Sequence, residues 1–566
     1  MCGILFTRGI EENSAKNALK KIKHRGPDAI NHIFLNNDFF GHVRLSILDL
    51  DERSNQPFFS KDGETLIFNG EIYNYLELKQ ILINKHKIKF KTTSDTEVLF
   101  WILKLDSEYL LNMMNGMWSF VFINKSSEIY FSRDRYGIKP MFLFYSDDKI
   151  IISSEISAIK SLKSLEVNFK CLTNFIYRPS SILGTNSFYK DVSDVECGFI
   201  FKLTKDNKIH KYYTLSELQS SDNIKNIVES AINLRRECDV TVGLTLSSGL
   251  DSNIIANVLS KNISNVGLNT FTVSTKNIDS FESDVAKEVS KKYNFFHNDI
   301  QLQSSNFIDD LSETISFLGR PHSSYAITSA NLMYREIAKK KIKVLIEGQG
   351  ADERFGGYRI SEYPKLFWNE MARFKFLKAF KIYKKSNVKI SYFLKNIFDK
   401  TTYVFGIFYY FKMISFLKFD LKTLSHLIPN KSTLDQNLQN LLFYSDHLSM
   451  RYGIEVRNPF MDFRLENLDS PKNSKFTKLA LRQNFKEIDK ELNMSIVWNT
   501  NKLGFYTPMR DLLLKNEKKI IKLHNSFRDR KIVKLRKLTS MKKTIKEEEV
   551  RLIYRIISSE LWLRNL

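Results

Sequence analysis

The chain has 566 residues, 43% of them hydrophobic and 13% aromatic, which suggests two or three domains with large buried cores. Its formal net charge is +23. The lysine pairs are dispersed and accompany no recognised nucleic-acid motif, so we interpret this charge as solvated surface and expect no nucleic-acid partner. The four cysteines and ten histidines lack metal-ligand spacing. This excludes a metal site built mainly from those residues and favours a reduced, cytoplasmic setting over a disulfide framework.

The sequence predicts no membrane span. The most apolar run, Tyr403–Leu417, is interrupted by Lys412, and it is shorter than the ~20 residues that a spanning helix needs. We also expect no signal peptide, because Arg8, Glu11 and Glu12 interrupt any apolar segment at the N-terminus.

The first ~200 residues are predicted to be rich in strands, because short apolar stretches alternate there with turn residues. Asn69-Gly70 and Tyr136-Gly137 are predicted turns. The predicted strands are Thr65–Phe68, Trp118–Ile123, Ile129–Ser132, Met141–Tyr145 and Gly198–Leu203.

From about residue 222 the pattern changes to strands that alternate with helices, which is typical of a parallel sheet. A predicted helix up to Glu237 leads into an apolar strand, Val240–Leu246, and the next helix is expected to begin near Asp251. A second short strand, Lys343–Glu347, ends in the turn Gly348–Gly350. Residues 361–440 are aromatic, rich in lysine and mostly helical in pattern, and their role is not readable.

Cys2 directly follows the initiator Met. Removal of that Met would place a free α-amine beside the thiol of the same residue. An α-amine titrates near pH ~7.7–8.0, so it can act as general base for the thiol. A cysteine at position 2 is by itself weak evidence, because it is more often incidental.

Five segments, the first of which contains Cys2, give this residue its context. In order along the chain they are Met1–Phe6, His24–Asp28, Arg44–Leu48, Asn69–Asn74 and Ser94–Glu97. Their order and spacing resemble the glutaminase domain of the asparagine synthetases, which are class II glutamine amidotransferases. Ser132–Pro140 and Ser153–Glu155 match as framework of the same domain.

The resemblance implies a role for each residue type. Cys2 would attack the glutamine amide, and Asn69 with Gly70 would form the oxyanion hole. Arg44 would bind the α-carboxylate of glutamine, while Glu71 and Asp95 would bind its α-ammonium. The implied glutamine site is completed by Leu45, Ser46, Ile47 and Leu48. Taken singly, Asn-Gly is a common hairpin turn, and Arg44 or Asp95 could be a surface charge.

The segment Leu246–Ser252 joins a predicted strand to a predicted helix, where small residues and backbone N–H groups can hold pyrophosphate. It lacks the Gly-Lys ending of a Walker loop. It resembles the loop of the ATP pyrophosphatases, with Ser248 replacing a glycine, and a positive φ there would strain the serine. The implied ATP contacts are Leu246, Ser247, Ser248, Gly249, Asp251, Ser252, Val273, Glu347 and Gly348.

Later segments extend the same resemblance. They are Glu347–Glu353, Phe355–Tyr358, Ser449-Met450, Glu455–Asp462, Lys478–Arg482 and Lys502–Phe505. By resemblance Asp251 and Asp352 would hold Mg²⁺, and Lys478 would stabilise the leaving pyrophosphate. The catalytic glutamate of the family is Gln349 here, which keeps hydrogen-bonding ability but loses charge and basicity. This leaves the amide acceptor open.

The resemblance implies two domains. Residues 2–213 would form an α+β glutaminase domain of layered antiparallel sheets flanked by helices. Residues 222–566 would form an α/β parallel-sheet ATP-pyrophosphatase domain with a helical C-terminal part and a basic, aromatic insert at about 361–440.

Three functions follow from these observations. The leading hypothesis is glutamine-dependent, ATP-driven synthesis of asparagine from aspartate, with a homodimer as one assembly open to the enzyme. The second keeps this chemistry but amidates another carboxylate, such as a uronic-acid sugar in surface polysaccharide synthesis. The third, from a different class, is a non-catalytic basic scaffold, which predicts salt-sensitive binding and no glutaminase activity.

Overall fold

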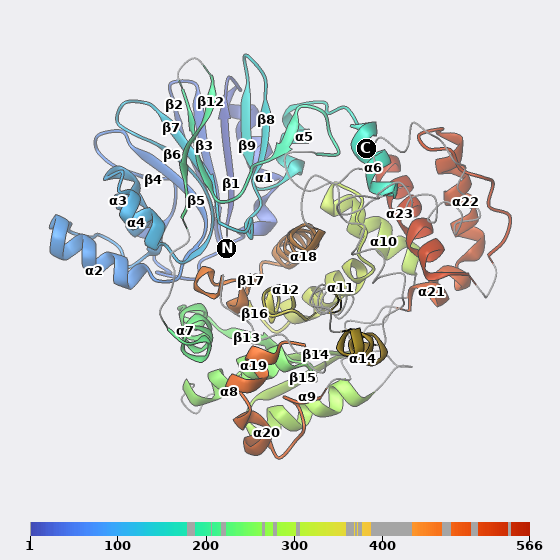
Figure 1. The fold of residues 1–566 in the computed structure, drawn as a ribbon. Coiled ribbons are helices and arrows are strands. Elements are labelled where there is room, and N and C mark those ends of the chain that lie inside the picture. The colour runs from blue at the N-terminus through green and yellow to red at the C-terminus, as the bar shows by residue number, and fades with distance from the viewer. Residues whose placement is uncertain are drawn as a thin grey trace.

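The computed structural model describes residues 2–177, 187–204, 207–216, 222–262, 267–274, 280–301, 306–357, 367, 371, 376–386, 433–466, 477–499, 508–541 and 545–566. Within them the chain forms two antiparallel sheets followed by one parallel sheet (Figure 1). Most of the predicted insert at 361–440 lies outside these residues, as does the predicted segment Lys502–Phe505.

Two six-stranded antiparallel sheets make up the N-terminal half. The first sheet, in spatial order, contains β10 (Val192–Asp194), β8 (Phe142–Tyr145), β9 (Ile150–Ser153), β1 (Gly3–Arg8), β3 (Asp38–Arg44) and β2 (Ala29–Leu35). The second contains β12 (Ile209–Thr214), β11 (Phe199–Leu203), β7 (Ile129–Arg133), β6 (Gly116–Ile123), β5 (Thr65–Ile72) and β4 (Phe58–Phe59).

The two sheets pack face to face because apolar residues occupy both faces of their central strands. Ile4 and Phe6 of β1 pack with Ile67 of β5 between the sheets. Their neighbours, Leu5 and Leu66, point to the outer faces, where helices cover them. This layering confirms the predicted antiparallel sheets flanked by helices. The helices of this half are α1 (Glu12–Lys20), α2 (Tyr75–His86), α3 (Asp95–Lys104), α4 (Glu108–Met113), α5 (Ile156–Leu162) and α6 (Phe169–Tyr177).

The predicted turn at Asn69-Gly70 is wrong. Both residues lie inside β5, where Asn69 pairs with Ser119 and Gly70 with Trp118 of β6. A glycine is required there because a Cβ on Gly70 would lie 2.1 Å from the carbonyl oxygen of Met117. The other predicted turn is confirmed, and Gly137 has a φ of +67°.

A five-stranded, fully parallel sheet follows. In spatial order it contains β15 (Phe296–Gln301), β14 (Asn269–Ser274), β13 (Val242–Thr245), β16 (Val344–Ile346) and β17 (Glu455–Arg457). Helices cover both of its faces, as expected for a parallel sheet, which confirms the predicted α/β class.

The helices of this second half continue the chain order. They are α7 (Ile224–Arg236), α8 (Leu250–Asn262), α9 (Ser280–Lys292), α10 (Phe307–Leu318), α11 (Ala326–Ala338), α12 (Ala351–Arg354), α14 (Phe376–Ser386), α18 (Thr433–Met450), α19 (Leu479–Asn484), α20 (Glu487–Leu492), α21 (Met509–Lys515), α22 (Glu517–Asp529) and α23 (Glu547–Arg564). Helix α14 belongs to the predicted insert and agrees with its helical pattern. Along the described stretches of the chain, no helix has the length and apolar character needed to cross a membrane.

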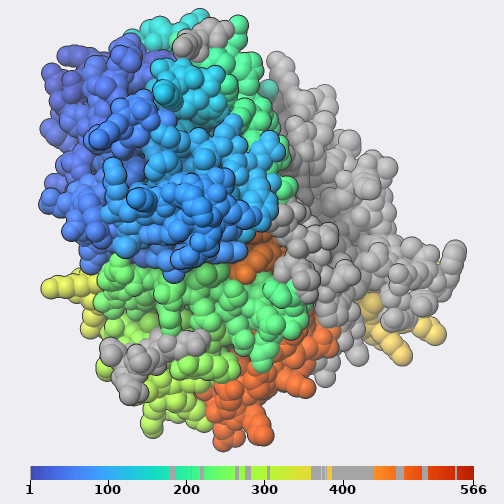
Figure 2. Space-filling view, turned by 90° about the vertical axis from the view of Figure 1, so that its left-hand side faces the viewer, coloured from blue at the N-terminus to red at the C-terminus, as the bar shows by residue number. Residues whose placement is uncertain are grey.

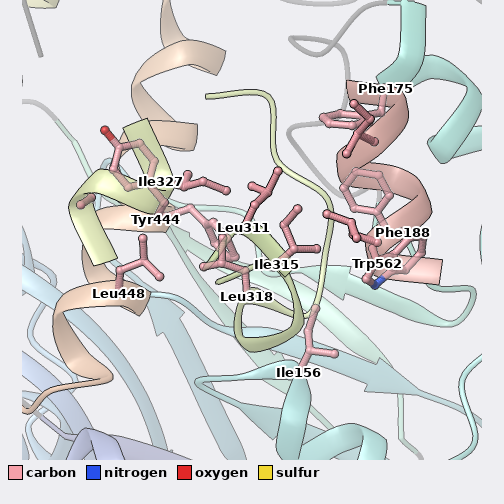
Figure 3. Packing of buried hydrophobic residues seen from close by; sticks show 14 of the residues in the cluster. Ile156, Phe175, Phe188, Leu311, Ile315, Leu318, Ile327, Tyr444, Leu448 and Trp562 are labelled. Carbon is pink, nitrogen blue, oxygen red and sulfur yellow. The ribbon is translucent and has the colours of Figure 1, made fainter. Parts of the chain in front are cut away.

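The two halves share one hydrophobic core. Phe175 and Phe188 from the N-terminal half pack with Trp562 of α23, and Ile156 lies near Leu318 of α10 (Figure 3). In the space-filling view the N-terminal half rests directly on the parallel-sheet half (Figure 2). The shared core therefore fixes the relative position of the two halves.

We predict that Trp562→Ala destabilises the whole chain. The Trp562 side chain is 1% exposed, and its Nε1 donates hydrogen bonds to Tyr189 Oη at 3.1 Å and to the Gly319 carbonyl at 2.9 Å. Its loss should lower the free energy of unfolding by about 3–5 kcal/mol, measured by urea denaturation. Trp498, which is 37% exposed, is the matched control, and Trp498→Ala should cost much less. Equal losses would contradict the shared core.

Candidate active site

A pocket of about 360 Å³ opens beside Cys2 at the end of the two antiparallel sheets. It brings together most of the residues that the sequence assigned to glutamine. The lining residues are Cys2, Arg44, Leu45, Ile47, Leu48, Ser54, Gln56, Phe68, Gly70, Glu71, Ser94, Asp95 and Thr96. Ser46 and Asn69 do not line it, and the Ser46 backbone N–H instead donates to Asp28 Oδ2 at 2.7 Å. Ser54, Gln56 and Phe68 were missed, because no motif in the sequence pointed to them. Ser94 and Thr96 lie in the Ser94–Glu97 motif but were given no role.

Cys2 is held at the start of β1, and its side chain is buried. Its backbone nitrogen, which would become the α-amine after loss of Met1, donates to Asn69 Oδ1 at 3.2 Å. Burial raises the pKa of the Cys2 thiol, against opposing effects from the N-terminal ammonium, the Leu45 backbone and Arg44. The thiol therefore needs a base close by to become a nucleophile.

Asn69 is placed by strand pairing rather than by a turn. It is fully buried, and its Nδ2 donates to Ser119 Oγ on β6 at 3.3 Å. The same side chain thus contacts the Cys2 nitrogen and β6, while its neighbour Gly70 lines the pocket. This arrangement suits an oxyanion hole.

Arg44 lies at the end of β3, and its guanidinium organises the loop that follows. Nη1 donates to the carbonyl of Asp51 and to Asn55 Oδ1, both at 2.8 Å. Nη2 donates to the carbonyls of Leu48, at 3.2 Å, and of Asp49. Within the described part of the chain, these bonds leave the Nε–H as the remaining donor toward a ligand. Arg44 therefore has two roles: it holds the loop of residues 45–51 in place, and it lines the pocket.

The opposite wall of the pocket carries excess negative charge. The carboxyls of Glu71 and Asp95 are both buried, and Asp95 Oδ2 accepts from the Ile72 N–H at 2.9 Å. Glu455, from β17 of the other half, adds a third buried carboxyl, while Arg457 ion-pairs with Glu71 at 3.3 Å and with Glu455 at 2.5 Å. Arg457 thus pairs with two of the three carboxyls, and among the described residues Asp95 has no ion pair, so its carboxylate can bind a further cation.

Burial and the neighbouring carboxyls raise the pKa values of this cluster. Burial raises the pKa of Asp95 to about 6, with a further contribution from Glu455. Burial together with Glu455 and Asp95 raises the pKa of Glu71 well above its ordinary value. A bound ammonium group would stabilise the ionised forms and lower both pKa values.

A second buried ion-pair chain links Cys2 to the other half. Arg25 is fully buried, and its Nε donates to the Cys2 carbonyl at 3.1 Å. Its other nitrogens reach Glu155 at 3.2 Å and Asp446 of α18 at 2.8 Å, and Lys139 also pairs with Asp446 at 3.2 Å. Sequence reasoning gave these residues no role, because their partners lie up to 421 residues away. Arg25 lay in the His24–Asp28 segment and Lys139 and Glu155 in the framework segments, whereas Asp446 lay in no motif.

The predicted ATP loop follows β13 and runs into α8, as expected. Ser252 Oγ accepts from the Ser247 N–H at 3.2 Å, and Ser247 Oγ accepts from the Gly249 N–H at 3.1 Å. Leu246 donates its N–H to the carbonyl of Phe271 on β14 at 2.9 Å, which places Val273 on the neighbouring strand. These bonds give the loop one closed conformation.

Ser248 carries no strain from its replacement of glycine. Among the described residues with a positive φ, Ser248 is absent. The expected strain required a positive φ at Ser248, and the residue does not have one.

The residues predicted to hold Mg²⁺ converge on one point. Lys478 Nζ lies 2.6 Å from Asp251 Oδ2 and 2.7 Å from Asp352 Oδ1. Lys478 is buried and has a φ of +53°, a backbone strain that is typical of functional positions. Among the described residues, no group of three or more His, Cys, Asp or Glu side chains could hold a metal by itself. Two carboxylates nevertheless suffice for Mg²⁺ when phosphates and water complete its shell.

Glu347, which is buried, and Gln349, which is half-buried, form a pair just beyond β16. Gln349 Nε2 donates to Glu347 Oε2 at 2.7 Å, and Tyr334 Oη donates to Glu347 Oε1 at 2.9 Å. Burial raises the pKa of Glu347 to about 7. The resemblance assigned Glu347 to ATP, but its carboxyl is engaged with these two side chains.

We predict that Arg457→Met lowers the free energy of unfolding by about 3–5 kcal/mol, because it leaves buried carboxylates without their cation. The measurement is urea denaturation at neutral pH. Lys190→Met is the control, since the Lys190–Glu166 pair is exposed to solvent and should contribute little to stability. If both variants lost a similar free energy of unfolding, the ion pairs of Arg457 would not be the strongly stabilising buried contact between the two halves that the geometry indicates.

Comparison with known proteins agrees with these two centres. The family model described as a glutamine amidotransferase domain matches residues 1–214, and the model described as asparagine synthase matches residues 223–564. A protein of Methanocaldococcus jannaschii, provisionally named glutamine-hydrolysing asparagine synthetase 2, is 30% identical over 414 residues, covering 66% of this chain and 79% of that protein. Glutamine-hydrolysing asparagine synthetase 1 of Bacillus subtilis is 31% identical over 372 residues, covering 62% of this chain and 57% of that protein.

A solved structure of glutamine phosphoribosylpyrophosphate amidotransferase from B. subtilis matches with a TM-score of 0.30 at 16% identity, over 62% of this chain and 77% of that one. This likeness is too low to carry an argument. The family match alone covers well over half of the residues. The chain therefore belongs to the asparagine synthase family, and it carries a glutamine amidotransferase domain in front of the synthase region.

Proposed function

We propose that this protein hydrolyses glutamine at Cys2 and uses the ammonia to convert aspartate to asparagine, with ATP split to AMP and pyrophosphate. The observation that carries the proposal is the pocket beside Cys2, whose buried carboxyls outnumber their cation. Residues 2–213 would form the glutaminase domain and residues 222–566 the synthetase domain.

The pocket supports each part of glutamine recognition. The α-ammonium of glutamine fits the negative wall formed by Glu71 and Asp95. The α-carboxylate would meet the Nε–H of Arg44 and the loop of residues 45–48 that Arg44 holds in place. The side-chain amide then reaches Cys2, whose freed α-amine takes the thiol proton, while Asn69 and the Gly70 N–H stabilise the oxyanion.

The second centre supports adenylation of a carboxylate. Asp251 and Asp352 already share one cation in the ammonium of Lys478, so the same two carboxylates fit Mg²⁺. When bound with ATP, Mg²⁺ would neutralise phosphate charge. Lys478 would stabilise the leaving pyrophosphate, and the backbone of Ser247, Ser248 and Gly249 would position the phosphates.

A second candidate differs only in the acceptor. Gln349 stands where the motif of the resembled family has a glutamate, and this difference favours a carboxylate other than aspartate, such as a uronic-acid sugar. Pyrophosphate release measured with aspartate and with a panel of carboxylates separates the two candidates. Release that depends on aspartate supports asparagine synthesis, whereas release with another carboxylate alone supports the second candidate.

We expect Cys2→Ala to abolish glutamine-dependent synthesis while ammonium-dependent synthesis stays within about twofold of the unmodified rate. The thiol is needed to release ammonia but not to use it. Amide product is measured by mass spectrometry with glutamine or with ammonium chloride as nitrogen source.

Cys171→Ala is the matched control, because Cys171 is also buried but lies on α6 and packs in the shared core. It should retain glutamine use. Continued use of glutamine by Cys2→Ala would mean that the nucleophile is assigned wrongly.

The KM for glutamine should rise as the pH falls below about 6. The pKa of Asp95 is raised to about 6 by burial, so the carboxyl becomes neutral below that pH and no longer attracts the substrate ammonium. The increase should approach about tenfold per pH unit, because one proton is taken up. Initial-rate glutaminase assays from pH 5 to 8 measure it. Asp95→Asn should raise the KM at every pH and remove this dependence. A KM that stays flat in the unmodified protein would contradict the assignment of the negative wall.

A further inference from the structure

We propose that Glu347 accepts the proton that ammonia loses when it attacks the activated carboxylate, a role that Gln349 cannot fill. The inference rests on the proposed function. It gives a catalytic role to the buried Glu347 carboxyl, which the sequence motif had assigned to ATP binding.

The position of Glu347 in the parallel sheet places it between the two candidate sites. Glu347 directly follows β16, which lies between β13 and β17. Strand β13 leads into the ATP loop, and β17 supplies Arg457, whose side chain reaches Glu71 in the Cys2 pocket. The Glu347 N–H donates to the Arg457 carbonyl at 3.0 Å. Glu347 is therefore located between the site that activates the carboxylate and the site that releases ammonia.

The next residue fixes the distance to the ATP loop. A Cβ built on Gly348 would lie 3.0 Å from Cβ of Asp251, so the chain leaving β16 passes directly against the start of α8. No larger residue fits at position 348 without moving Asp251. Glu347 and Gln349 consequently flank the point at which this chain touches the candidate phosphate site.

The groups around Glu347 allow it to change its protonation state. Tyr334 of α11 and Gln349 donate to its two oxygens, and Tyr334 Oη lies 3.1 Å from Ser445 Oγ on α18. Tyr444 of α18 also faces it, whereas Arg457 offers only its backbone carbonyl. No cation among these described neighbours pairs with the carboxylate. Burial raises the pKa of Glu347 to about 7, where a carboxylate can both accept and release a proton.

Gln349 adds an independent observation. Its Oε1 is buried and has no hydrogen-bond partner among the described residues, while its Nε2 is committed to Glu347. A buried amide oxygen without a donor is costly. It suits an N–H donor from a ligand, and ammonia or an amino group of the acceptor provides one.

The step balances as follows. The lone pair of ammonia attacks the acyl carbon of the adenylate, a C–N bond forms, and the carbonyl π electrons move to oxygen. One N–H proton passes to the Glu347 carboxylate. The intermediate then collapses, the C–O bond to AMP breaks, and AMP leaves with that electron pair. Glu347 returns its proton to solvent.

Glu347→Gln separates this step from adenylation. In the intact protein supplied with ATP, Mg²⁺, labelled pyrophosphate and ammonium chloride, the ratio of amide formation to ATP–pyrophosphate exchange should fall about 30-fold or more. The acceptor is aspartate or whichever carboxylate supports exchange. Exchange by the unmodified protein tests the proposed function, and the ratio of amide formation to exchange in the variant tests Glu347. A ratio that does not change would overturn the role of Glu347.

The pH profile distinguishes proton transfer from a merely structural effect. Expressed per free ammonia, the unmodified rate should rise with pH through about 7 and then level off, because only the ionised carboxylate accepts a proton. Tyr334→Phe removes a hydrogen bond that lowers the pKa of Glu347, so this rise should move to higher pH. The rise should be absent in Glu347→Gln. Its persistence there would refute the assignment.

A swap variant, Glu347→Gln with Gln349→Glu, tests the same claim with the pair preserved. It keeps one acid and one amide in hydrogen-bonding reach, so it carries the test even where the single variant fails to fold. Amide formation should recover to within about tenfold of the unmodified rate. A swap variant that folds and exchanges pyrophosphate, but forms amide as slowly as Glu347→Gln, would show that this pair does not accept the proton.

Discussion

The structure depends on one buried residue, Arg457. Its side chain contacts the Cys2 pocket, and its backbone contacts the residue beside the candidate phosphate site. Its guanidinium is fully buried and neutralises Glu71 in the Cys2 pocket and Glu455 on its own strand. Its backbone carbonyl accepts from Glu347 beside the candidate phosphate site. A guanidinium with its carboxylates in a dry interior holds one geometry, because any displacement leaves an uncompensated buried charge. The two chemical centres are therefore kept at a fixed distance by β17.

The shared core explains why this joint can exist. Aromatic residues such as Phe188 and Trp562 belong to different halves of the chain but to one cluster (Figure 3). Burial on that scale prevents the halves from moving apart, which allows polar groups such as Arg25 and Asp446 to pair without water between them. In the proposed function, such a rigid arrangement suits transfer of a small, neutral and diffusible intermediate from one centre to the other.

The sequence predicted what is local, and it missed what is brought together by folding. The alternation of apolar and turn residues predicted strands in the first part of the chain, and the family resemblance implied that they form layered sheets. The resemblance also implied a set of residues around Cys2, most of which line one pocket. The turn at Asn69-Gly70 was wrong because strand β6 pairs across both residues. The sequence could not predict that loop carbonyls bind the Arg44 guanidinium or that Arg457 connects the two halves, because these contacts form only when the chain folds. The sequence showed that position 349 carries no charge. Only the structure shows that the Glu347 carboxyl lies 2.7 Å from the Gln349 side chain, and this contact suggests a role for Glu347.

The central claim is that ammonia released at Cys2 ends in an amide made at the second centre. The most direct measurement is mass spectrometry of the product formed from glutamine labelled with ¹⁵N in its amide, ATP, Mg²⁺ and aspartate, in the presence of excess unlabelled ammonium. The account predicts labelled asparagine, with AMP and pyrophosphate formed in equal amounts. Glutamine hydrolysis without any labelled amide from aspartate, and without AMP that depends on it, would contradict the account.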